Sequence, residues 1–94
     1  MKGIIVENEI FASTLDYAHG HGQMIKRIII PEVDNLAITP HGDQIYVFSG
    51  YEIDDESKRI KEIEVPDELV QKAIAYKKAR DDFFQLKVNF QELL

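Results

Sequence analysis

The clearest pattern of apolar and polar positions covers the last third of the chain, residues 66–94. Apolar side chains recur there at steps of three or four, which places them on one side of a helix. This apolar stripe consists of Leu69, Ala73, Tyr76, Ala79, Phe83, Leu86, Phe90 and Leu93. Pro66 suits the first helical position, and acids at 67 and 68 complement the helix dipole. The pattern predicts one long amphipathic helix, with a break near residues 87–89 as an alternative.

The first two thirds of the chain contain short runs of β-branched and aromatic residues, which are typical of strands. The runs that we interpret as strands are 3–6, 24–30, 36–39, 44–53 and 59–65, with 10–15 as a further candidate. A turn is predicted at 40–43, where proline suits the first corner and glycine a left-handed position. We therefore expect a three-stranded meander between about residues 36 and 65, with two earlier strands added to it.

These patterns predict a single α+β domain that covers residues 1–94. Residues 1–65 would form a β-rich body with a small antiparallel sheet of about five strands, and residues 66–94 one long C-terminal amphipathic helix. Lys26 and Arg27 fall near the start of the strand at 24–30, where we expect side chains to reach solvent.

Residues 35–47, with the sequence Asn-Leu-Ala-Ile-Thr-Pro-His-Gly-Asp-Gln-Ile-Tyr-Val, resemble the central hairpin of a YVTN-type β-propeller blade. The resemblance implies a hairpin at this point. It carries no function, because a propeller needs several blades of about 40 residues and no other stretch repeats the motif.

The length of the predicted helix suggests a partner. About 29 residues span roughly 43 Å, whereas a compact body of 65 residues is roughly 28 Å across. The apolar stripe continues over the expected overhang, where exposure to water is unfavourable at about 25 cal/mol per Å². Three outcomes stay open: the helix pairs with a second copy as a homodimer, folds back on its own sheet, or docks on another protein. Our first hypothesis is a small non-enzymatic protein-interaction module that acts through this helix.

Composition narrows the classes of partner. The net charge of −6 makes nucleic acid an unlikely ligand, because phosphates attract basic surfaces. Eight acids and three bases lie between residues 52 and 68, so an acidic decoy for a nucleic-acid-binding protein is a weaker alternative. The simpler explanation of these acids is a solvated hairpin tip followed by a helix start, where acidic residues are favoured. The chain has neither a long apolar run nor a signal-peptide pattern, so we expect a cytoplasmic protein without membrane contact.

The residues that could carry chemistry are few. His19 and His21 form a His-x-His pair, and His41 is the third histidine, which makes these three the candidate metal ligands. The loop from His19 to Gln23 would then serve a metal- or small-ligand-binding protein, our second hypothesis. Glycines at 20 and 22 favour a flexible, exposed turn instead. No serine lies in a nucleophile-elbow context, and no glycine-rich loop precedes a helix. We therefore expect neither catalytic residues nor a cofactor.

Overall fold

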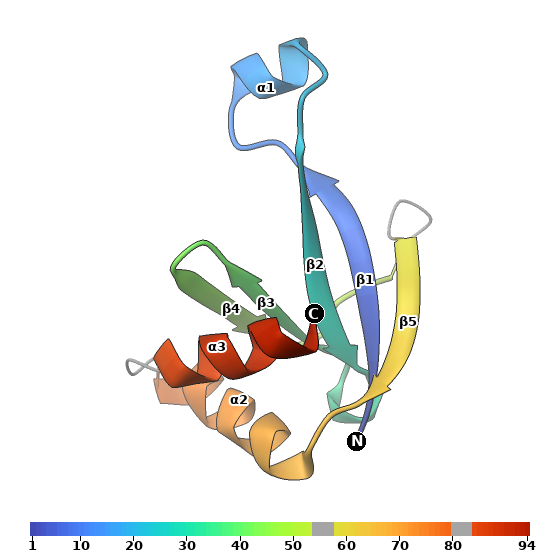
Figure 1. The fold of residues 1–94 in the computed structure, drawn as a ribbon, viewed down its shortest axis with the longest axis vertical. Helices are drawn as coiled ribbons and strands as arrows, with labels where there is room; N and C mark the ends of the chain where they lie inside the picture. Colours follow the sequence, from blue (N-terminus) through green and yellow to red (C-terminus); the bar gives the residue numbers. More distant parts are fainter. Residues whose placement is uncertain (54–57, 80–83) are drawn as a thin grey trace.

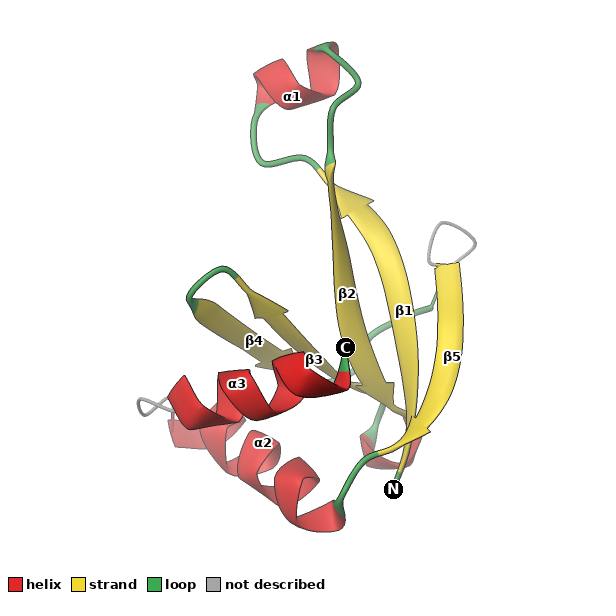
Figure 2. Ribbon diagram, viewed as in Figure 1, coloured by secondary structure: helices red, strands yellow, loops and turns green. Residues whose placement is uncertain are grey.

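The computed structural model describes residues 1–53, 58–79 and 84–94, which form an α+β fold with a five-stranded antiparallel sheet (Figures 1 and 2). In chain order the elements are β1 (Lys2–Ile10), α1 (Thr14–Ala18), β2 (Gln23–Ile30), the 3₁₀ turn η1 (Pro31–Val33), β3 (Leu36–His41), β4 (Gln44–Phe48), β5 (Lys58–Glu64), α2 (Asp67–Ala79) and α3 (Phe84–Leu93). Both longer helices cover the same face of the sheet (Figure 2).

The strand order in the sheet is β4-β3-β2-β1-β5. The predicted hairpin is confirmed by β3 and β4, and Gly42 takes a left-handed conformation with φ 60°. The turn is tighter than predicted, because Pro40 belongs to β3 and pairs with Ile45 instead of forming the first corner. The expected meander is wrong at its third strand, because β5 pairs with β1 at the opposite edge of the sheet. The connection from β4 to β5 contains Tyr51 and Ile53, which pack against the face of the sheet opposite the helices. Burial of these two side chains stabilises a connection that crosses the sheet.

The stretch at residues 10–15 does not form the strand that was considered for it. β1 extends to Ile10 and the chain then enters α1, where the Ser13 hydroxyl accepts a hydrogen bond from the Asp16 amide at 3.1 Å. A serine in this position caps a helix start, and that local hydrogen bond competes with strand pairing. α1 lies at the far end of an arm built from β1 and β2 (Figure 1).

The single long helix is also a wrong prediction, because the C-terminal segment forms α2 and α3. The two helices lie side by side on the sheet, and Val70 of α2 shares one core cluster with Phe90 of α3. This is the fold-back outcome considered above. α3 continues through residues 87–89, so the helix does not break there. Burial of Phe90 and Leu86 against the chain's own sheet supplies the stabilisation that was expected from a partner.

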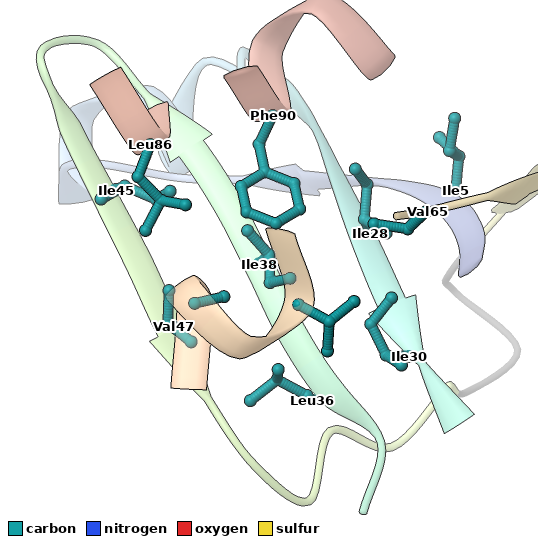
Figure 3. Packing of buried hydrophobic residues seen from close by; sticks show 12 residues of the cluster. Ile5, Ile28, Ile30, Leu36, Ile38, Ile45, Val47, Val65, Leu86 and Phe90 are labelled. Atoms are coloured by element: carbon teal, nitrogen blue, oxygen red, sulfur yellow. The ribbon is translucent and has the colours of Figure 1, made fainter. Parts of the chain in front are cut away.

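The main core lies between the sheet and the two helices (Figure 3). Its fully buried side chains include Ile28 and Ile30 of β2 and Ile38 of β3. The Tyr76 hydroxyl donates a hydrogen bond to the Ile45 carbonyl at 3.0 Å, which fixes α2 to β4. A smaller cluster, Ile4, Val6, Ile29 and Ala37, occupies the opposite face, which we call the open face.

Candidate functional site

The predicted interaction stripe lies mostly inside the molecule. Ala73, Leu86 and Phe90 are buried, and Leu69, Tyr76 and Leu93 are partly buried against the same core. Phe83 falls outside the described residues, as does the side chain of Ala79. The buried members of the stripe therefore belong to the chain's own core, and the described residues do not leave the apolar overhang from which assembly was inferred.

The three histidines do not gather into one site. His19 and His21 are exposed at the end of the arm with ring centroids 6.5 Å apart. His41 lies on β3, where its Nε2 is 3.1 Å from the Gln23 Oε1. Within residues 1–53, 58–79 and 84–94, no group of three His, Asp or Glu side chains is arranged to hold a metal ion.

Two acids of the acid-rich stretch, residues 52–68, form ion pairs with the amino group of Met1. Asp54, Asp55 and Glu56 fall outside the described residues. Glu64 and Asp67 bind the amino group of Met1 at 2.7 and 2.8 Å. These two acids therefore have a structural role, since they hold Met1, the residue before β1, at the junction of β5 and α2.

The sheet opens into a fork between β2 and β3. These strands pair only from Ile28 and Ile38 to Ile30 and Leu36. Beyond that point β2 follows β1 along the arm, while β3 follows β4 in its own hairpin (Figure 1). Residues 23–27 consequently have β1 as their only strand neighbour in the part of the chain that the structure describes.

A hollow lies on each side of this fork. On the open face, a hollow of about 420 Å³ is lined by Ile10, Ile25, Arg27, Thr39, His41, Tyr46 and Phe48. On the helix side, a second hollow of about 430 Å³ lies between β2, the β3–β4 turn and the end of α3. The Lys87 ammonium donates to the Gly42 carbonyl at 3.2 Å, which holds that turn to α3.

Most of the exposed large apolar side chains lie on the two branches of the fork, the arm and the β3–β4 hairpin. The arm carries Leu15 and Tyr17 at its tip, 64% and 73% exposed, together with Phe11 and Met24. Tyr46 and Phe48 are exposed on the facing hairpin. Among the described residues, Ile60 on β5 is the one large apolar side chain of comparable exposure elsewhere. Apolar surface gathered in this way is typical of an interaction site.

Arg27 is the unusual residue of the hollow on the open face. Its side chain is only 8% exposed, and its guanidinium carbon lies 4.9 Å from the centre of the Tyr51 ring. No carboxylate of residues 1–53, 58–79 and 84–94 forms an ion pair with it, and its Nε has no hydrogen-bond partner. A buried charge without a counterion costs several kcal/mol, and a cation–π contact returns about 0.5–2 kcal/mol.

Two further polar atoms on this face lack partners. The Thr39 hydroxyl lies in the same hollow, with the side chain 3% exposed, and Asn8 Oδ1 is buried on the neighbouring strand β1. Sequence reasoning missed the site because it placed Arg27 in solvent at a strand start. The available signal was alternation, since Arg27 shares a strand face with Ile25 and Ile29.

Comparison with protein-family models, with curated proteins and with solved structures finds no match for the chain. No helix within the described residues is long and apolar enough to cross a membrane. The fork and the arm are the features of the chain that point to a function.

Proposed function

We propose that this chain is a small non-enzymatic protein-interaction module that pairs with a second copy of itself along the fork-facing edge of β2. The observation that carries the proposal is the early separation of β2 from β3, which leaves residues 23–27 with one strand neighbour among the described residues. An edge of this kind presents backbone N–H and C=O groups to an incoming strand.

The sequence of this edge is compatible with pairing to itself. An antiparallel arrangement centred on Ile25 places Ile25 opposite Ile25 of the second copy. Gln23 then faces Arg27, and Met24 faces Lys26, so that no like charges are opposed. Such an interface is self-complementary, as a two-fold dimer requires.

Two features bear on the strength of the dimer. The arm tip and β4 carry exposed apolar side chains, and we expect the second copy to cover part of them. The exposed hydrogen bond between His41 and Gln23 would be exchanged, at a cost of about 1 kcal/mol. We expect a dissociation constant of about 10–100 µM, because the edge is short.

The test is the solution mass over a range of concentrations, by sedimentation velocity or light scattering. Met24→Lys is the diagnostic variant, because it opposes two lysines across the pair while Met24 itself is 53% exposed. Ile60→Lys on β5 is the matched control, since Ile60 is 41% exposed. We expect the natural protein and the Ile60 variant to dimerise alike, and the Met24 variant to dimerise about tenfold more weakly or worse. A monomer at several hundred micromolar, or equal loss in both variants, contradicts the proposal.

A further inference from the structure

We infer that the hollow on the open face is a binding site for a small monocarboxylate with an apolar body, held by Arg27. This goes beyond self-pairing, because it concerns a face of the sheet and a ligand rather than the edge of β2. It rests on the unpaired polar atoms of the hollow and on the apolar side chains beside them.

The charged end of the ligand is set by Arg27. Its guanidinium is buried, lies against the Tyr51 ring, and has no described carboxylate near it. A guanidinium matches the geometry of a carboxylate through two parallel N–H donors. The Thr39 hydroxyl, buried and without a partner in the same hollow, supplies a further donor. A carboxylate in this position would satisfy both groups together.

The body of the ligand is set by the rest of the lining. Ile10, Ile25, Tyr46 and Phe48 line the hollow together with the arginine, and both aromatic residues are exposed. The volume of about 420 Å³ falls within the range of small-molecule sites. With one buried cation in a mostly apolar lining, the site suits a singly charged acid better than a phosphate dianion.

The apolar part of such a ligand can be aromatic or aliphatic, because the lining suits both and the carboxylate is the same in each. The probes are therefore 2-naphthoate and decanoate, and their uncharged counterparts are 2-naphthamide and decanamide. Binding is followed by two-dimensional ¹⁵N–¹H NMR, in which the Arg27 Nε–H resonance reports on the unpaired donor itself. The titration is repeated on Met24→Lys protein, so that failure of self-pairing and failure of ligand binding are read separately.

The matched variants are Arg27→Gln and Arg59→Gln, the second on the exposed strand β5. We expect at least one of the two acids to shift the Arg27 Nε–H signal and to bind about tenfold or more tightly than its uncharged counterpart, the naphthamide or decanamide. Arg27→Gln should remove that preference, and Arg59→Gln should leave it unchanged. Should Arg27→Gln fail to fold, Thr39→Val provides the second variant, with an expected loss of several-fold in affinity.

Three results would overturn the inference. One is equal affinity for acid and amide in the natural protein, and another is equal loss in the two arginine variants. The third is an unchanged Arg27 Nε–H signal at about 10 mM of either acid. A preference between naphthoate and decanoate identifies the body that the hollow takes.

Discussion

At the scale of single residues, the core of this small domain depends on exact packing. Ile28 is fully buried between the sheet and the helices, whereas Ile60 is 41% exposed on β5. Ile28→Val removes one buried methyl group and should lower the free energy of unfolding by about 0.5–1.5 kcal/mol. The same change at Ile60 should cost less than about 0.5 kcal/mol. Urea denaturation of both variants measures the difference, and equal values would mean that the packing around Ile28 is looser than described.

The amino group of Met1 provides a residue-scale prediction about pH. Hydrogen bonds from it to Asp67, the larger contribution, and to Glu64 raise its pKa above the ordinary value of about 8. The folded pKa exceeds the unfolded one, so this stabilisation is fully present below about pH 8 and is lost as pH rises through the folded pKa. Urea midpoints of the natural protein should therefore fall between about pH 7 and pH 9.5. Amino-terminal acetylation should remove most of this step, and an unchanged step would assign it to other groups.

At the scale of elements, the β3–β4 hairpin was predictable because a left-handed glycine, Gly42, marks its turn. Pro40 was expected at the first corner of that turn but lies in β3. The apolar spacing of residues 69–93 is the same for one straight helix as for two helices on one sheet, so periodicity could not reveal the division into α2 and α3. The position of β5 beside β1 depends on contacts about 60 residues apart, which no local pattern encodes.

The candidate site around Arg27 could not be predicted either, because its residues are far apart in the sequence. Arg27 is surrounded by residues from β1, β3, β4 and the connection after β4, and only the folded sheet brings them together. The histidine pair was prominent in the sequence because its members are adjacent. Spacing along the chain therefore predicted the hairpin, but it indicated the histidine pair as a candidate site and not the residues around Arg27.

The close approach of β1 to Val65, the residue after β5, is tested at Gly3. A Cβ at this position would lie 2.8 Å from Val65 Cγ2 and 3.1 Å from Ile28 Cγ2, both in packed surroundings. Gly3→Ala should therefore destabilise the protein by about 1–3 kcal/mol. Gly22→Ala is the matched control, because the atoms it would crowd belong to the flexible side chain of Glu9. A thermal melt of both variants compares them, and an unshifted melting temperature for Gly3→Ala would argue against this approach of β1 to Val65.

At the scale of the whole molecule, the arm gives the protein its length. The principal extents are 42 × 28 × 22 Å, and the radius of gyration of 13.5 Å exceeds the value of about 12 Å expected for a compact chain of this size. The sequence suggested an elongated shape with a projecting helix, whereas in the structure β1, β2 and α1 project (Figure 1). The surface proposed for assembly consequently moves from the C-terminal helices to the arm.

Net charge determines how that assembly should respond to salt. Each copy carries −6, so two copies repel one another when counterions are scarce. Raising sodium chloride from about 20 mM to about 500 mM should tighten the dimer several-fold, because the proposed edge pairing contains no ion pair that salt would weaken. Glu9→Gln removes an acid from the arm beside Met24 and should tighten the dimer at low salt while reducing its salt response. Sedimentation velocity at both salt concentrations measures each effect. If salt instead weakens the dimer, ion pairs hold the two copies together, and the edge of β2 is not the main contact.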